Sequence, residues 1–241
     1  MDQKIALVTG ANRGLGLEIS RQLAQRGLHV WLGVRDVAQG QLAEQLLRRE
    51  GLAVGLLPLD ITDPAAIAAA VAQVQHHHQR LDVLVNNAAM QTTDGQLPSA
   101  ITAELLHRFL DVNYVAHVRV TQAFLPLLRQ SPAGRIVNMS TSLGSVTIMS
   151  EPGHANARRN LIGYSSAKAA LNMFTVLLAK ELKETAIKVN SADPGWTRTE
   201  LGGADALLSA EQGARVPVWL ATLDEQGPSG SFFTQGTTNP W

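Results

Sequence analysis

The segment Ile5-Ala6-Leu7-Val8-Thr9-Gly10-Ala11-Asn12-Arg13-Gly14-Leu15-Gly16 decides the fold of this chain. Its first four residues are apolar without a break, which predicts a buried strand, and Leu15, Ile19 and Leu23 follow at helical spacing. Glycines between a strand and a helix let the backbone approach a ligand closely, at the positive end of the helix dipole. Three spaced glycines are a weak motif by themselves, but their place in a strand-turn-helix unit indicates binding of a dinucleotide pyrophosphate.

Short apolar runs and helical patterns alternate along the rest of the chain. Asp63 and Pro64 are typical of a helix start, and this helix is predicted to extend to about Gln79. The turn residues Gly227–Gly230 lead into a last short strand over Ser231–Thr234. This alternation predicts an α/β fold, a doubly wound (Rossmann) parallel sheet of about seven strands with helices on both faces and ligands at the carboxyl ends of the strands. The other predicted strands are Val30–Leu32, Val54–Leu57, Val83–Val85, Ile136–Met139 and Ile187–Val189.

The composition limits the classes of protein to which the chain can belong. It has 241 residues, 45% of them hydrophobic, so residues 1–241 are predicted to form a single domain, which the glycine motif indicates is dinucleotide-binding. The lack of cysteine excludes disulfides, thiolate metal sites and a cysteine nucleophile. A formal net charge of zero argues against a nucleic acid or an anionic membrane as partner. We see no signal peptide and no apolar stretch long enough to span a membrane, so we expect a soluble, cytoplasmic protein.

A second group of candidate functional residues is Tyr164-Ser165-Ser166-Ala167-Lys168. It opens a segment of good helix formers that runs to Glu184. Residues four apart lie on one face of a helix, so the phenol and the ammonium group would stand side by side. A neighbouring positive charge favours the phenolate, so we expect Lys168 to lower the pKa of Tyr164 from its ordinary value of about 10. Such a pair is often a solvated surface feature, but together with the glycine motif it indicates an acid or base.

These two motifs resemble those of the short-chain dehydrogenase/reductase family, and the resemblance covers essentially the whole chain. The glycine spacing resembles the single-domain branch of the family rather than its extended branch. Within the family, the chain is most similar to the carbonyl reductases, through Val34-Arg35-Asp36, Leu59-Asp60-Ile61, Leu81–Asn87 and Pro194-Gly195-Trp196. Further matching segments are Asp60-Ile61, Leu81–Asn87, Asn86-Asn87-Ala88-Ala89, Asn113, Ser140-Thr141-Ser142 and Pro194–Thr199.

The resemblance implies hydride transfer between a nicotinamide cofactor and a carbonyl carbon, with Asn113, Thr141, Tyr164 and Lys168 as catalytic residues. Tyr164 would give its proton to the developing alkoxide. Lys168 would hold the nicotinamide ribose, and Asn113 would carry a water that links Lys168 to solvent. No metal is required. The implied cofactor-binding residues are Gly10, Asn12, Arg13, Gly14, Leu15, Gly16, Arg35, Asp60, Ile61, Asn87, Ala88, Tyr164, Lys168, Pro194, Gly195, Thr197 and Thr199.

The resemblance also implies where the substrate binds. A hydroxyl group among Ser140, Thr141 and Ser142 would hold the substrate oxygen. Because the family usually has serine where this chain has Thr141, either Thr141 or its neighbour Ser142 would take this role. Both Trp196 and Ser142 would line the substrate pocket. Before Tyr164 the chain carries about ten residues more than the shortest members of the family, and these would form an active-site loop.

The end of the second predicted strand indicates which cofactor is preferred. A carboxylate there would bind the ribose hydroxyls of NAD, whereas an arginine suits the 2′-phosphate of NADP. Asp36 lies 20 residues after Gly16, which is compatible with NAD. By the pattern of the family, however, the discriminating position is Val34, and Arg35 follows it. Arg13 adds a second cation, so we expect NADP(H).

Two charged segments have simpler interpretations. His76–His78 follows no metal-ligand spacing, and cationic histidine is favourable near the negative end of a helix, so we expect surface residues. Arg158-Arg159 is either a solvated loop pair or a contact for an acidic substrate.

These observations predict NADPH-dependent reduction of a ketone or aldehyde, reversible as alcohol oxidation. One alternative is NAD-dependent oxidation of a sterol or sugar alcohol. Another is a non-catalytic nucleotide-sensing protein, which would have no need of Asn113, Tyr164 and Lys168 together. The expected partner is a small carbonyl or alcohol substrate, and we expect a homodimer or homotetramer.

Overall fold

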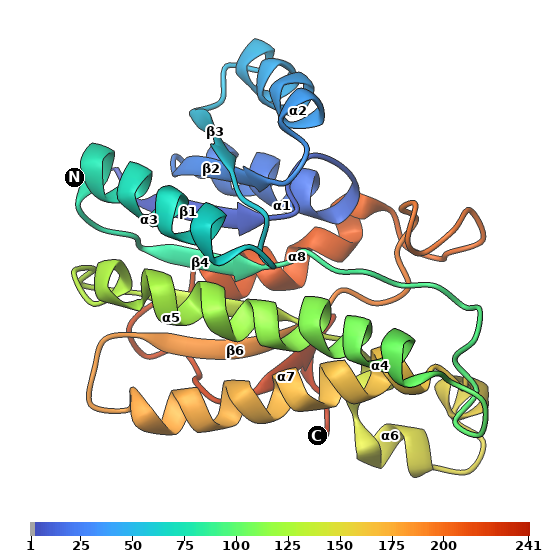
Figure 1. Ribbon diagram of the computed structural model, residues 1–241. Helices are drawn as coiled ribbons and strands as arrows, with labels where there is room; N and C mark the ends of the chain where they lie inside the picture. The colour runs from blue at the N-terminus through green and yellow to red at the C-terminus, as the bar shows by residue number, and fades with distance from the viewer. Residues whose placement is uncertain (1–2) are drawn as a thin grey trace.

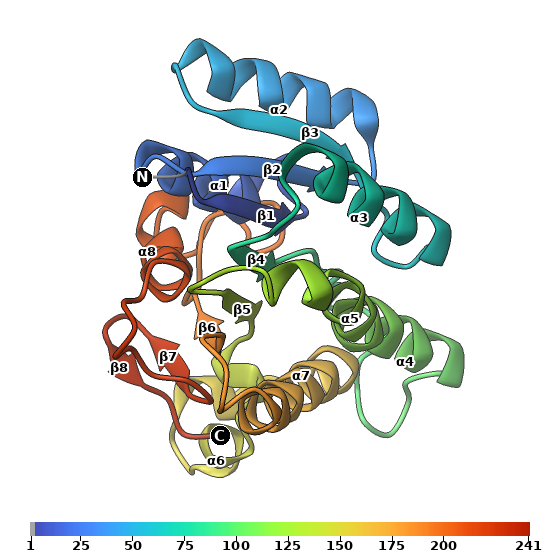
Figure 2. The ribbon, with the colours of Figure 1, turned by 90° about the vertical axis from the view of Figure 1, so that its left-hand side faces the viewer.

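The computed structural model describes residues 3–241, and one eight-stranded sheet runs through its centre (Figure 1, Figure 2). Its strands are β1 (Ile5–Thr9), β2 (His29–Val34), β3 (Val54–Pro58), β4 (Val83–Asn86), β5 (Arg135–Met139), β6 (Lys188–Asp193), β7 (Phe232–Thr234) and β8 (Thr237–Thr238). The order across the sheet is β3-β2-β1-β4-β5-β6-β7-β8. All neighbours are parallel except β7 and β8. The predicted doubly wound parallel sheet is confirmed, with β8 as one short strand more than expected.

Helices cover both faces of the sheet (Figure 2). The helices are α1 (Gly14–Gln25), α2 (Val37–Arg49), α3 (Pro64–His78), α4 (Ala103–Leu110), α5 (Ala116–Leu128), α6 (Val146–Ser150), α7 (Ile162–Glu181) and α8 (Ala210–Ala221). Helices α1, α2 and α8 share one hydrophobic cluster with the sheet, and α3, α5 and α7 share another on the opposite face. In Figure 2 these two groups lie on opposite sides of the strands.

Strand β1 shows why the strands are apolar throughout instead of alternating. All five of its residues are buried. Ala6 and Val8 belong to the cluster with α1 and α8, whereas Ile5 and Leu7 belong to the cluster with α3 and α5. Because side chains alternate between the faces and both faces are covered, Ile5–Val8 is apolar at every position, and the buried Thr9 at the carboxyl end is the polar residue of this strand.

The predicted helix after the third strand is confirmed as α3. Pro64 is its first residue, and the Asp63 carboxylate accepts a hydrogen bond of 2.9 Å from the Ala65 amide. The helix ends at His78, where Gln79 follows in the left-handed conformation with φ of 58°. A proline that needs no amide partner and a capping carboxylate together define this helix start.

The histidines at the end of α3 differ in part from the expectation. His76 and His77 are exposed, but the ring of His78 packs on that of His29, with 5.0 Å between the centroids. Burial lowers the pKa of His78, and the neighbouring His77 adds to the effect, so the expected cationic surface residue is wrong at this position. Within residues 3–241, no three His, Asp or Glu side chains are arranged to hold a metal ion.

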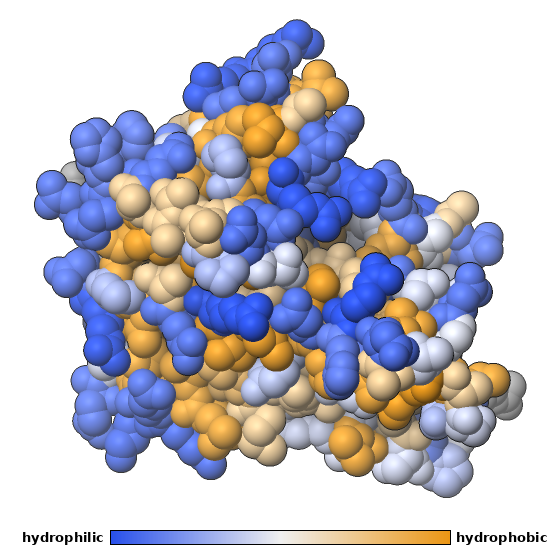
Figure 3. Space-filling view, viewed as in Figure 1, coloured by the Kyte–Doolittle hydropathy of each residue, from blue (hydrophilic) through white to orange (hydrophobic). Residues whose placement is uncertain are grey.

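The helices α4 and α5 are joined by one turn of π-helix, Asp111–Val115. The periodicity of the sequence does not distinguish this wide turn from α-helix, although such turns are frequent at functional sites. The outer face of α7 carries Met173 and Leu177, and Figure 3 shows apolar side chains at the surface over α5 and α7. In the part of the chain that the structure describes, no helix has the length and apolarity needed to cross a membrane.

Candidate active site

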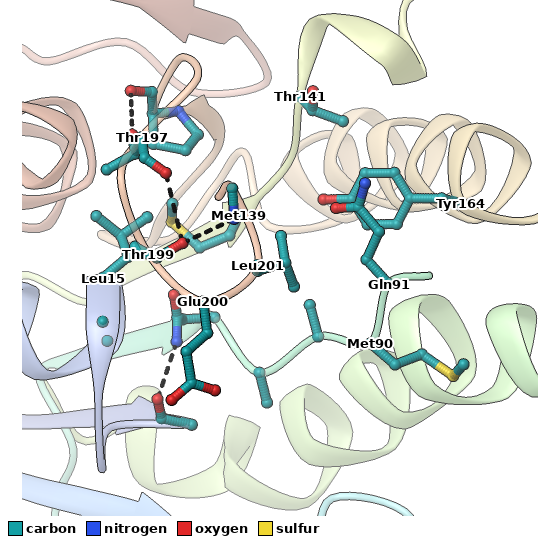
Figure 4. Close-up of a pocket in the computed structure, with 18 of the residues that line it drawn as sticks. Leu15, Met90, Gln91, Met139, Thr141, Tyr164, Thr197, Thr199, Glu200 and Leu201 are labelled. Atoms are coloured by element: carbon teal, nitrogen blue, oxygen red, sulfur yellow. Dashed lines mark hydrogen bonds between the residues drawn. The ribbon is translucent and has the colours of Figure 1, made fainter. Parts of the chain in front are cut away.

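A pocket of about 1030 Å³ opens at the carboxyl ends of the parallel strands, where the loops after β1 to β6 meet. All predicted cofactor-binding and substrate residues line it, and so do Thr141, Tyr164 and Lys168. Among the predicted site residues, only Asn113 does not line this pocket. Figure 4 shows Thr141, Gln91 and Tyr164 at one end of the pocket and Leu15 and Glu200 at the other. The sheet therefore brings together predicted cofactor-binding residues that lie up to 189 positions apart, from Gly10 to Thr199.

The glycine turn after β1 forms a cradle that a side chain would fill. Gly10 has φ of 66°, and a Cβ atom on Gly16 would lie 2.3 Å from the Gly10 carbonyl oxygen. The Asn87 side chain holds this turn by donating to the Thr9 carbonyl at 2.8 Å. Arg13 precedes α1 without a side-chain cap, and the first turn of α1 carries no acidic residue. The first amides of α1 thus have no side-chain acceptor, and the cradle fits the pyrophosphate of a dinucleotide.

The loop after β2 carries the residues predicted to choose the cofactor. Val34 is buried in the core, and Arg35 lines the pocket. Asp36 also lines the pocket, but its carboxylate accepts from a backbone amide in the first turn of α2 at 3.1 Å. Burial raises the pKa of Asp60, yet the hydrogen bonds from Thr62 and the charge of Arg35 hold it below its ordinary value. Asp36, the acidic residue next to Arg35 in sequence, is therefore engaged in capping helix α2.

Tyr164 and Lys168 lie side by side on α7, as their spacing predicts. Both are buried, and the Lys168 Nζ atom lies 5.8 Å from the centre of the Tyr164 ring. This Nζ atom donates a hydrogen bond of 2.7 Å to the Met139 carbonyl at the end of β5. Burial lowers the pKa of Lys168 to about 7. Burial also raises the pKa of Tyr164, with a smaller contribution from Asp193. The expected lowering by Lys168 is therefore wrong here, because desolvation of the phenol decides the direction of the shift.

The three hydroxyl groups after β5 differ in their hydrogen bonds. The amide and the hydroxyl of Ser142 both donate to the Asp193 carboxylate, the amide at 2.8 Å. Thr141 Oγ1 accepts from the Leu143 amide at 3.3 Å, which leaves its proton free to donate. The Ser140 hydroxyl is buried and has no hydrogen-bond partner among the described residues. Ser142 is therefore engaged with the carboxylate, whereas Thr141 retains a free donor at the pocket wall.

Asn113 has a supporting position behind the pocket. It is fully buried in the π-helical turn, and its side-chain amide exchanges two hydrogen bonds of 3.1 Å with the backbone of Met90. Its Nδ2 atom also donates to the Phe109 carbonyl at 3.2 Å. The Asn113 side chain thus fixes the segment after β4, whose residues Met90 and Gln91 line the pocket.

Several lining residues were missed by the sequence motifs. Asp193, which is the last residue of β6, directly precedes Pro194, so its proximity to that motif was a usable signal. Gln91 lies two residues after the Asn86–Ala89 motif, so its proximity to that motif was also a usable signal. Glu200 forms an ion pair with Arg13 across the pocket, and no pattern in the sequence relates these two positions.

The segment before α7 contributes to the pocket, as expected of an active-site loop. It forms α6 and a 3-10 turn, Ala155–Arg158, and Asn156 and Arg159 line the pocket. The side chain of Arg158 lies outside the described residues. Trp196 also lines the pocket and is 43% exposed.

A doubly wound sheet with a glycine cradle and a buried tyrosine-lysine pair at its carboxyl edge defines a dinucleotide-dependent oxidoreductase. The chain belongs to the short chain dehydrogenase family, whose model matches residues 4–207. Members of this family use a nicotinamide cofactor.

Relatives with known names cover almost the entire chain. The (+)-neomenthol dehydrogenase of Arabidopsis thaliana is 33% identical over 286 residues, which cover 96% of each chain. Carbonyl reductase (NADPH) 1 of Sus scrofa is 34% identical over 278 residues, which cover 99% of this chain and 94% of that protein. The solved structure of an NADPH-bound carbonyl reductase from chicken fatty liver matches with a TM-score of 0.88 and 27% identity over the whole of both chains. The protein is thus an oxidoreductase of the carbonyl reductase type.

Proposed function

We propose that this protein uses NADPH to reduce a ketone or aldehyde to an alcohol, and that it oxidises the alcohol in the reverse direction. The observation that carries the proposal is the buried Tyr164-Lys168 pair in the same pocket as the glycine cradle. When bound, the nicotinamide cofactor would supply the hydride.

The residues of the chain account for the proton chemistry. Because burial raises the pKa of Tyr164, its phenol is neutral at pH 7 and has a proton to donate to the substrate oxygen. The charged form of Lys168, 5.8 Å from the ring, stabilises the phenolate that this donation leaves. The Thr141 hydroxyl donates a hydrogen bond to the same oxygen as its negative charge develops. Asn113 supports this end of the pocket through its hydrogen bonds to Met90, and Ser142 and Trp196 complete the wall that faces the substrate.

NADPH is favoured over NADH by the charges around the adenosine end of the pocket. Arg35 and Arg13 both line it, and the Asp36 carboxylate is engaged at the start of α2. Arginine binds a phosphate with two parallel hydrogen bonds, which the ribose hydroxyl of NADH does not offer. We expect Arg35→Ala and Arg13→Ala to raise the KM for NADPH about tenfold or more and to change the KM for NADH little. Equal effects on both cofactors would contradict this assignment.

The decisive experiment measures loss of NADPH absorbance at 340 nm with a panel of ketones, aldehydes and quinones. Tyr164→Phe should reduce kcat by about 10²- to 10⁴-fold while NADPH binding, followed by fluorescence, is retained. Tyr114, the second tyrosine of the chain, lies outside the pocket lining, and Tyr114→Phe is the matched control. Cofactor binding without turnover of any substrate, or an unchanged rate in Tyr164→Phe, would refute the proposal.

We further propose that residues 1–241 act as a single domain and that the protein is a homodimer or homotetramer. Met173 and Leu177 on the outer face of α7 support a contact between copies at this surface. Light scattering of the wild type and of Leu177→Glu measures the mass, which should fall to that of a monomer in the variant. A monomeric wild type would contradict the proposal.

A further inference from the structure

A cation lies over the face of an indole in the lining of the pocket. The guanidinium carbon of Arg159 lies 5.3 Å from the ring centre of Trp196, and both residues line the pocket. The indole is itself held in place, because Trp196 Nε1 donates a hydrogen bond of 2.8 Å to the Gly202 carbonyl. Arg159 is only five residues before Tyr164 in the chain.

The positive charge of Arg159 is not neutralised by the protein. Arg159 is exposed and forms no ion pair among the described residues, and the same holds for Arg108, a second arginine in the pocket lining. The carboxylates nearby in the lining already have partners. Asp193 accepts from Ser142, and Glu200 is paired with the arginine of the glycine turn. Arg159 and Arg108 therefore line the pocket without an acidic partner of their own, and the Asp193 carboxylate is the negative charge closest to Tyr164 that remains unpaired by a cation among the described residues.

A guanidinium held against an aromatic face keeps the edges of its hydrogen-bonding fork available. Stacking uses the flat face of the group, whereas the N–H groups point outward in its plane. This geometry matches a carboxylate, which accepts two parallel hydrogen bonds from one arginine. A solvated arginine without such a platform has more conformational freedom to lose on binding.

We propose that Arg159, held by Trp196, binds a carboxylate of the substrate, so that the substrates include oxo acids whose ketone or aldehyde group reaches Tyr164. This inference rests on the proposed carbonyl reduction and specifies its substrate class. Arg159 acts as a specificity residue: it binds the carboxylate end and takes no part in the proton transfer. Arg159 lies between the 3-10 turn Ala155–Arg158 and the start of the tyrosine helix α7 at Ile162.

The test uses pairs of oxo acids and their methyl esters, which differ in charge but present the same carbonyl group. A series of increasing chain length is reduced with NADPH, and kcat/KM of each acid is divided by that of its ester. For the best chain length we expect the wild-type ratio to exceed about 10, and Arg159→Gln to lower it by about 10- to 100-fold, the range for a charge-assisted hydrogen-bond pair. Arg159→Lys, which keeps the charge without the planar fork, should retain only part of the preference.

Exposed Arg49 at the end of α2 is outside the pocket lining, and Arg49→Gln is the control, in which the ratio should stay at the wild-type value. Circular dichroism and NADPH binding verify that each variant is folded. An acid-to-ester ratio that is equal in wild type and Arg159→Gln, or a wild-type preference for esters, would overturn the inference while the esters still show carbonyl reduction. If no acid, ester or neutral ketone is reduced, the proposed function itself fails.

Discussion

Replacement of His117 by leucine should remove a large part of the acid sensitivity of the fold. His117 on α5 is fully buried, and neither ring nitrogen has a hydrogen-bond partner within residues 3–241, although the Ala88 carbonyl lies near the ring. Burial, together with the charge of Lys168, lowers the pKa of His117 to about 3. The folded protein therefore holds this imidazole in its neutral form at all but strongly acidic pH.

The size of the effect follows from the two pKa values. Below pH 6.5 the unfolded chain binds a proton at His117 that the folded protein does not accept until about pH 3. Stability is therefore lost progressively as the pH falls from 6.5 toward 3, and the total is about 5 kcal/mol at about 1.4 kcal/mol per pH unit. Between pH 7 and pH 5, the same linkage removes about 2 kcal/mol. At neutral pH the variant should lose little, because leucine replaces polar atoms that make no hydrogen bond.

Urea unfolding at pH 7, 6 and 5 measures this linkage directly. The free energy of unfolding should fall by about 2 kcal/mol less in His117→Leu than in wild type between pH 7 and pH 5, or about 0.7–1 M in the urea midpoint. His107→Leu on α4 is the matched control, because it removes an exposed imidazole instead of a buried one. If leucine prevents folding, His117→Gln removes the same titration. Identical losses in the wild type and the folded His117 variant would refute the reasoning.

Three further changes test the pocket and the core. Gly16→Ala would place a methyl group 2.3 Å from the Gly10 carbonyl oxygen, so it should weaken NADPH binding, measured by fluorescence, by about tenfold or more. An unaltered affinity would contradict the role of the glycine turn in binding the pyrophosphate. Glu200→Gln releases Arg13 from an exposed ion pair and should lower the KM for NADPH a few-fold, because this carboxylate competes with the cofactor phosphate; an unchanged KM would contradict that competition. Arg135→Leu removes the hydrogen bonds of the guanidinium to four backbone carbonyls, and two of these, Ala186 and Leu223, have no other donor among the described residues. The substitution should lower the free energy of unfolding by roughly 3 kcal/mol, as urea titration would show, and a loss below about 1 kcal/mol would contradict this role.

The parallel core could be predicted because both faces of each strand are covered. Ile5–Val8 has no polar position, and its residues pack alternately into the two clusters. The strand β8 could not be predicted, because Thr237–Thr238 is a two-residue exposed ladder whose pattern is that of a turn. The π-helical turn at Asp111–Val115 was missed for a different reason: one extra residue per turn leaves the hydrophobic period almost unchanged over five residues.

In the site, motifs within one element were predictable and contacts between elements were not. The glycine turn and the Tyr164-Lys168 pair each lie within a single strand-turn-helix or helix, where spacing determines geometry. By contrast, Ser142 and Asp193 are 51 residues apart, and only the register of β5 against β6 brings them together. The stacking of Arg159 on Trp196 likewise depends on the course of two loops, which composition does not specify.

Spacing on one helix predicts that Tyr164 and Lys168 are neighbours, but it does not predict how they share charge. Burial moves both groups toward their neutral forms, because it raises the pKa of the phenol and lowers that of the ammonium to about 7. A tyrosine whose pKa is raised keeps its proton at neutral pH and is a weaker acid than a solvated phenol, so it donates only as negative charge develops on a nearby oxygen. A lysine that titrates near pH 7 can stabilise the resulting phenolate as a cation and can also pass a proton back to it. Because desolvation opposes proton release, the proton donation proposed for Tyr164 depends on the charged form of Lys168 to stabilise the phenolate.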